Sequence, residues 1–84
     1  MHNFYMQRRR RYELFQKALM DARQARRLTQ TEVAQRLGKP QSYVSKYESG
    51  ERRLDVVEFL EVCDAMNVAP QSIIQEIEKV NSSD

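Results

Sequence analysis

The chain has 84 residues, of which 40% are hydrophobic and 31% charged, and its net charge is +2. A chain of this length buries one small core, which leaves little room for an enclosed active site. With only two glycines and two prolines, the composition favours a compact all-helical domain over an all-β module or a disordered tail.

The sequence contains no pattern typical of a metal site or of a membrane-spanning segment. Cys63 is the only cysteine and His2 the only histidine, so neither an internal disulfide nor a Cys/His cluster for zinc can form. The longest apolar run is too short to span a bilayer, and the N-terminal charge follows the apolar residues, the reverse of a secretory signal. We therefore expect a cytoplasmic protein without a metal, a cofactor or a membrane partner.

The charge is divided unevenly along the chain. Residues 1–53 contain 13 Lys and Arg against five Asp and Glu, a net charge of +8, whereas residues 54–84 contain one Lys against seven acids, a net charge of −6. A basic half joined to an acidic half suggests one face built for a polyanion and another kept away from it. The alternative is an ordinary solvated mixture of charges.

The N-terminal stretch, residues 1–11, shows no apolar period and ends in the run Arg8 to Arg11. It predicts a basic arm or a frayed helix start that precedes a domain over residues 12–80. Such an arm could lie along phosphates, or it could be a solvated tail that raises solubility.

A first amphipathic helix is predicted from Tyr12 to about Arg27. Its apolar residues recur at intervals of three and four: Leu14, Phe15, Ala18, Leu19, Ala22 and Ala25. Arg26 and Arg27 close the helix, where the backbone dipole favours positive charge.

Thr29 followed by Glu32 is a capping box, which predicts that a second helix begins at Gln30. Its apolar stripe consists of Val33, Ala34 and Leu37. Gly38 suits the left-handed position that ends a helix. Pro40 then fixes the chain direction for a third helix, Gln41 to Ser49, with Val44 and Tyr47 turned inward.

Two more helices follow. Asp55 with Glu58 is another capping arrangement, and the apolar residues of the fourth helix, which ends near Asn67, are Val56, Phe59, Leu60, Cys63 and Met66. Pro70 opens a fifth helix that runs to about Val80, and residues 81–84 are expected to fray.

Over roughly residues 12–75 the chain resembles the helix-turn-helix domain of the phage repressor and Cro family, the XRE-type regulators. The residues that carry the resemblance are Gln30, Ala34, Gly38, Val44, Glu48 and Gly50. The resemblance implies an all-α fold, a five-helix bundle of the lambda-repressor-like DNA-binding type with a helix-turn-helix.

Several of these positions carry a physical demand. Ala34 must be small because the second and third helices cross closely there, and Gly38 must tolerate a positive φ. Val44 is expected to be buried under the third helix. Arg23 and Glu48 stand where family members place a basic and an acidic residue, so we predict a partly buried ion pair between them.

In the resembled family the third helix lies in the major groove. Carried over residue by residue, the implied base-reading residues are Gln41, Ser42, Tyr43, Ser45 and Lys46. The implied phosphate-binding residues are Gln30, Thr31, Lys39, Arg52 and Arg53. Tyr43 could equally pack against its own domain.

The sequence departs from the family pattern at two positions. Pro40 stands where a Ser or Thr commonly caps the third helix, and because proline offers no side-chain acceptor the cap must be made differently. Asn67 replaces a usual glycine, but asparagine tolerates the same left-handed geometry.

The fifth helix is expected to form a dimer interface. Its apolar residues, which exceed a single stripe, are Ile73, Ile74, Ile77 and Val80, and a symmetric partner would stabilise the surplus. The alternative is that the isoleucines close the core of the monomer.

These features predict a sequence-specific DNA-binding transcription regulator that binds a palindromic operator as a homodimer, as a repressor would, and that has no catalytic residues. No nucleophile with a base and no phosphate-cradling glycine loop is present. The alternative is a helix-turn-helix adaptor, or an antitoxin subunit, that acts mainly by binding another protein.

Overall fold

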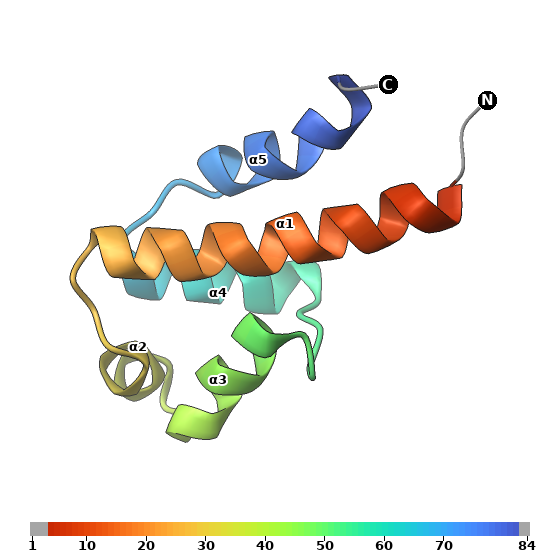
Figure 1. The fold of residues 1–84 in the computed structure, drawn as a ribbon. Coiled ribbons are helices and arrows are strands. Elements are labelled where there is room, and N and C mark those ends of the chain that lie inside the picture. The colour runs from red at the N-terminus through yellow and green to blue at the C-terminus, as the bar shows by residue number, and fades with distance from the viewer. Residues whose placement is uncertain (1–3, 83–84) are drawn as a thin grey trace.

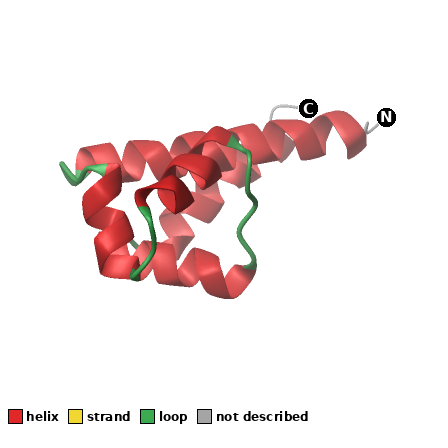
Figure 2. Ribbon diagram, turned by 90° about the horizontal axis from the view of Figure 1, so that it is seen from below, coloured by secondary structure: helices red, strands yellow, loops and turns green. Residues whose placement is uncertain are grey.

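The structure is a computed structural model that describes residues 4–82. Within this range the chain forms five helices and no strand, joined by short loops (Figures 1 and 2). The helices are α1 (Phe4–Ala25), α2 (Gln30–Leu37), α3 (Gln41–Ser49), α4 (Val56–Met66) and α5 (Pro70–Ser82). The predicted all-α fold with five helices is confirmed.

The long helix α1 is the axis of the molecule. In Figure 1, α5 lies on one side of it while α2 and α3 lie on the other, and α4 lies behind it. α1 packs on α5 and α3, whereas α4 packs on α2 and α5. The pair α2 and α3 is therefore held at one edge of the bundle by α1 and α4.

One core joins the helices. Its fully buried side chains are Leu19, Val33, Val44, Val62, Cys63 and Met66, with Ala34 beside them at 1% exposure. Ala34 and Val44 occupy the packed positions that the sequence predicted for them. Burial raises the pKa of the Cys63 thiol to about 11, so this cysteine is a neutral packing residue at pH 7.

Helix α1 begins eight residues earlier than predicted. The arm expected over residues 1–11 is therefore wrong for residues 4–11, where the alternative of a helix start is confirmed, and residues 1–3 lie outside the described range. Met, Gln and Arg are good helix formers and no Gly or Pro interrupts them, so the helix propagates through Arg8 to Arg11. Gln7 is buried in this segment.

The C-terminus of α1 has a cap that the sequence did not reveal. Arg27 adopts the left-handed conformation with φ 57°, and the Leu28 amide donates to the Arg23 carbonyl at 3.1 Å. This 6→1 hydrogen bond ends helices in the Schellman motif. The helix consequently stops at Ala25, two residues before the predicted end.

The predicted N-caps are confirmed. The Glu32 amide donates to Thr29 Oγ1 at 3.1 Å and the Thr29 amide donates to Glu32 Oε1 at 2.9 Å. Asp55 and Glu58 make the same reciprocal pair at 2.8 and 2.9 Å. Both boxes satisfy amides that a helix leaves without partners.

Two of the left-handed C-caps, Gly38 and Asn67, are also where the sequence placed them. Gly38 has φ 67° and closes α2 by donating to the carbonyls of α2. Asn67 has φ 58° and closes α4 in the same way, so asparagine replaces glycine here without a change of geometry.

Helix α5 corrects the predicted dimer interface. Ile73 and Val80 are each only 3% exposed within the monomer, and Ile77 is half-buried against the core. Only Ile74 is exposed, at 44%. The assignment of Ile73 and Val80 to a dimer surface is wrong, because α5 runs along α1 and turns these residues inward. α5 also continues to Ser82, two residues past its predicted end.

The carboxylate of Glu58 leads to a prediction about pH. Its hydrogen bond to Arg52 and then its bond to the Asp55 amide lower the pKa of Glu58 below 4.5. A group with a lowered pKa in the folded state stabilises the fold above its unfolded pKa and loses this effect as the pH falls through the folded pKa. We expect Glu58→Gln to lower the thermal midpoint at pH 7, with the difference from wild type shrinking below about pH 4.5.

Thermal unfolding followed by circular dichroism from pH 7 to pH 3 measures this difference. Glu61→Gln, a change at an exposed carboxylate on the same helix, controls for net charge. A Glu58→Gln deficit of constant size across this range would contradict the prediction.

Candidate nucleic-acid interface

Helices α2 and α3 are joined by a turn of three residues. The Lys39 amide donates to the Ala34 carbonyl at 2.9 Å, and Gly38 supplies the positive φ that this close return requires. Pro40 occupies the N-cap of α3 and makes no side-chain capping bond. Its carbonyl instead accepts from the Tyr43 amide at 3.0 Å, so α3 begins at Gln41 as predicted.

The two faces of α3 differ sharply. Val44 and Tyr47 are buried in the core, whereas Gln41, Ser42 and Lys46 are exposed. Ser45 is half-buried on the same outward face, one helical turn beyond Gln41. The structure thus brings four of the five predicted base-reading residues together on one solvent-facing surface.

Tyr43 differs from the other four. Its ring is half-buried against the core and meets the Tyr47 ring edge to face, with 5.7 Å between the ring centroids. The Arg52 guanidinium lies 4.8 Å and the Lys39 ammonium 5.5 Å from the centroid of the Tyr43 ring. Burial raises the pKa of the Tyr43 hydroxyl, which stays protonated at pH 7. Tyr43 therefore positions two of the predicted phosphate ligands.

A chain of polar contacts runs from α1 to the outward face of α3. Arg23 Nε and Nη2 donate to the two carboxylate oxygens of Glu48 at 2.7 and 3.0 Å. Gln30 Nε2 donates to Glu48 Oε1 at 3.0 Å, and Gln41 Nε2 donates to Gln30 Oε1 at 2.6 Å. We call Arg23, Glu48, Gln30 and Gln41 the polar relay.

The relay is anchored in the core. The side chains of Arg23 and Glu48 are only 11% and 4% exposed, and Arg23 Nη1 also donates to the Leu28 carbonyl at 2.8 Å. The predicted partly buried ion pair is confirmed. Each member of the pair has a second contact, Arg23 with the Leu28 carbonyl and Glu48 with Gln30. The pair therefore fixes the angle of α3 against α1.

The remaining predicted phosphate ligands are not equivalent. Thr31 and Lys39 are exposed, but Arg52 donates from Nη2 to Glu58 Oε2 at 2.6 Å. Arg53 is exposed and its guanidinium carbon lies 4.0 Å from the centroid of the Tyr12 ring. Arg52 is therefore paired with a carboxylate, while the Arg53 guanidinium is held beside α1 by the Tyr12 ring.

Two arginines of the basic half serve the fold. Arg26 donates to the Asn67 carbonyl and Arg36 donates to the Ala65 carbonyl, each at 2.8 Å. Both bonds neutralise the carboxyl end of α4, where the helix dipole is negative. Arg26 and Arg36 are therefore engaged within the fold, and the positive charge that can face a polyanion is smaller than the net charge of residues 1–53.

Sequence reasoning missed the contact of Gln41 with Gln30 and the support that Tyr12 gives to Arg53. Neither has a local sequence signal, since both join residues from different helices. Among residues 4–82 no group of three His, Cys, Asp or Glu side chains is placed to hold a metal. In that same range no helix has the length and apolarity needed to cross a bilayer.

Comparison with known proteins agrees with this geometry. A family model described as helix-turn-helix matches residues 19–73. The chain is similar to the solved structure of an XRE-family like protein from Pseudomonas syringae pv. tomato str. DC3000, with 43% identity, 86% of this chain and 88% of that chain covered, and a TM-score of 0.80. It is also similar in fold to the clp gene regulator ClgR from C. glutamicum, with 22% identity, 82% and 90% coverage, and a TM-score of 0.75. No curated protein matches the sequence.

Proposed function

The chain belongs to the XRE-type helix-turn-helix family, and on that premise we propose that it is a sequence-specific DNA-binding transcription regulator. Helix α3 enters the major groove, and the chain binds a palindromic operator as a homodimer. In this role it represses by occupying the operator.

The observation that supports this proposal most is the outward face of α3. Gln41, Ser42 and Lys46 are exposed side by side, and they are suited to adenine, to either kind of base and to guanine, respectively. Gln41 is already oriented by its 2.6 Å bond to Gln30. A preorganised amide loses little side-chain entropy when it meets a base edge.

The phosphate contacts are assigned to the surface around α3. The start of α2 presents Thr31 and the amides of its first turn, Lys39 precedes α3 in the chain, and Arg53 follows it. These groups set the position of the domain on the duplex. Base preference comes from α3 alone.

Selection of bound duplexes from a random pool tests the proposal. We expect an enriched inverted repeat whose half-sites lie roughly 34–36 Å apart, one helical turn of DNA. We also expect the logarithm of the affinity to fall linearly with the logarithm of the salt concentration, with a slope of about −0.9 for each phosphate neutralised. A pool that enriches no sequence would contradict the base-reading role of α3.

A second candidate function is that of an adaptor or antitoxin subunit. It is favoured by the exposed apolar side chains of α4, since Val56, Val57 and Leu60 are 73%, 66% and 43% exposed. A protein partner could cover them. A chain that retains no duplex at low salt while binding another protein through α4 would support this function over the first.

A further inference from the structure

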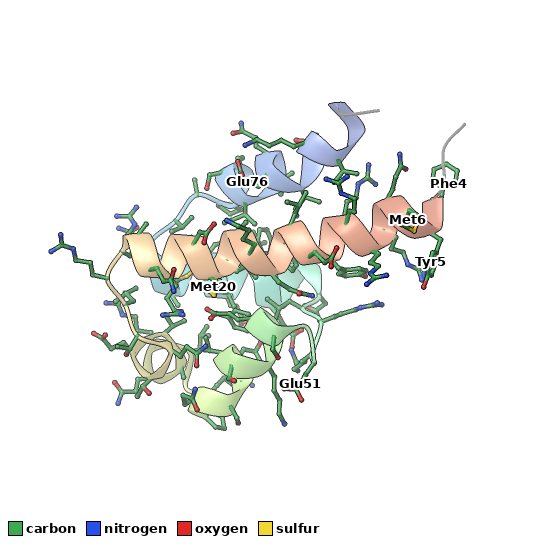
Figure 3. All side chains as sticks on the ribbon, viewed as in Figure 1. Phe4, Tyr5, Met6, Met20, Glu51 and Glu76 are labelled. Atoms are coloured by element: carbon green, nitrogen blue, oxygen red, sulfur yellow. The ribbon has the colours of Figure 1, made fainter. Side chains whose placement is uncertain are left out.

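The first turn of α1 places three large apolar side chains in solvent. Phe4, Tyr5 and Met6 are 77%, 71% and 48% exposed, and they stand at the end of α1 that projects beyond α3 and α4 (Figures 1 and 3). We call these three residues the apolar tip. Contiguous exposed side chains of this size mark an interaction site more often than single ones do.

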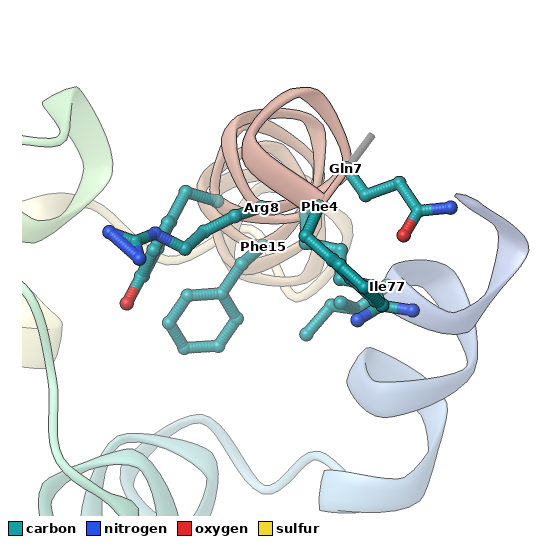
Figure 4. Close-up of a pocket in the computed structure, with 7 residues that line it drawn as sticks. Phe4, Gln7, Arg8, Phe15 and Ile77 are labelled. Atoms are coloured by element: carbon teal, nitrogen blue, oxygen red, sulfur yellow. The ribbon is translucent and has the colours of Figure 1, made fainter. Parts of the chain in front are cut away.

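A groove opens beside the apolar tip, between α1 and α5. Figure 4 shows Phe15 in its interior, with Ile77 of α5 on one side and Arg8 on the other. Its volume is about 420 Å³, within the range of sites that receive a side chain or small ligand. The Phe15 ring packs edge to face on Phe59 of α4, with 5.4 Å between centroids, so the groove reaches the core.

The same short segment therefore carries both a projection and a cavity. Phe4 belongs to the apolar tip and also lines the mouth of the groove. A surface that holds both parts is self-complementary under a two-fold rotation, because each chain can insert its tip and receive the tip of the other. This property selects a second copy of the chain as the occupant.

The charge at the groove is positive. Arg8 and Arg11 line it, and on α5 the Glu76 carboxylate pairs with Lys79 of the same chain at 2.7 Å. In a two-fold arrangement the arginines of the two chains approach each other, so the apolar contact supplies the affinity and salt is expected to strengthen the dimer.

The area is sufficient for a stable contact. An aromatic side chain buries about 150–250 Å² when it is fully covered, and Phe4 and Tyr5 are 77% and 71% exposed, so from two chains they can remove about 450–750 Å². The surfaces that cover them lose a comparable area, and the total of about 900–1,500 Å² overlaps the roughly 1,200–2,000 Å² of specific interfaces. Figure 1 shows α5 and α3 on opposite sides of α1, so this contact leaves α3 uncovered.

We propose that the chain dimerises through α1 and α5, with the apolar tip of each copy seated in the α1–α5 groove of the other. This interface deepens the proposed function and rests on it, since it supplies the homodimer that a palindromic operator requires. It replaces the buried α5 residues with the start of α1 as the site of self-association.

Sedimentation velocity of the full chain without DNA tests the interface. We expect wild type to dimerise, and Phe4→Asp and Tyr5→Asp each to weaken the dimer at least ~10-fold, or about 1.4 kcal/mol. An aspartate in the first turn suits the helix dipole, so circular dichroism should show an unchanged helix content. Val57→Asp, a matched change at an equally exposed apolar residue of α4, should leave the dimer intact.

Three results would overturn the interface: a wild-type chain that stays monomeric up to about 1 mM, a Phe4→Asp chain that dimerises as wild type does, or dissociation by Val57→Asp alone. Measuring the binding of the chain to a duplex with a single half-site distinguishes failure of the proposed interface from failure of the proposed DNA-binding function. A dimer that responds to Phe4→Asp but retains no duplex would refute only the function, whereas half-site binding without a responsive dimer would refute only the interface.

Discussion

Glu48→Ala is expected to destabilise the fold by about 3–5 kcal/mol, because it strands the Arg23 guanidinium without its charged partner. The two side chains are 11% and 4% exposed, and they share two hydrogen bonds of 2.7 and 3.0 Å. Each kcal/mol lowers the thermal midpoint of a domain of this size by about 4–8 °C. Thermal unfolding measured by circular dichroism or calorimetry gives the loss directly.

The double replacement Arg23→Met with Glu48→Leu should be less destabilising than Glu48→Ala alone, since it removes both charges and keeps apolar volume. Asp21→Ala is the matched control, because it breaks the solvent-exposed pair of Asp21 with Lys17 at 2.7 Å. It should move the midpoint little. Equal losses for Glu48→Ala and Asp21→Ala would show that burial of the pair contributes nothing.

Gln41→Ala is expected to weaken binding to the selected operator by about 1–3 kcal/mol, or roughly 5- to 150-fold. The loss should depend on the base that faces Gln41, because a bidentate amide discriminates adenine from other bases. The salt dependence should not change, since no charge is removed. Fluorescence anisotropy with the operator and with single-base variants measures both quantities.

Two variants give this experiment its contrast. Arg53→Ala should weaken binding to all sequences alike and make the salt slope shallower by about 0.9. Gln75→Ala removes an exposed glutamine of α5, on the other side of α1 from α3, and should have no effect. A Gln41→Ala loss that is uniform across base variants would argue against base reading.

The sequence predicted those elements whose signals are local. The capping boxes at Thr29 and Asp55 and the glycine at position 38 predicted both ends of α2 and the start of α4, because each cap involves residues three or four apart. The ion pair of Arg23 with Glu48 followed only from the family resemblance. Its spacing of 25 residues has no local signature.

The failures came from tertiary packing. The start of α1 was missed because an arginine run is compatible with both a helix and an extended arm. The burial of Gln7, which supports the helix, cannot be predicted from the residues next to it in the sequence. Ile73 and Val80 are buried because α1 runs along α5. The apolar period of α5 shows that these residues are covered but cannot show whether α1 or a second chain covers them. Gln41 was placed on α3, but its bond to Gln30 depended on how α2 and α3 cross.

The polar relay limits how far the recognition surface can be transplanted. The Gln41 amide is oriented through Gln30 and Glu48, which are residues of α2 and of the inner side of α3. Grafting only the exposed residues of α3 onto another scaffold would transfer the contacting atoms without their support. Under the proposed function, a substitution at position 30 would likewise redirect Gln41, so the preferred operator sequence would change while the predicted base-reading residues stay the same.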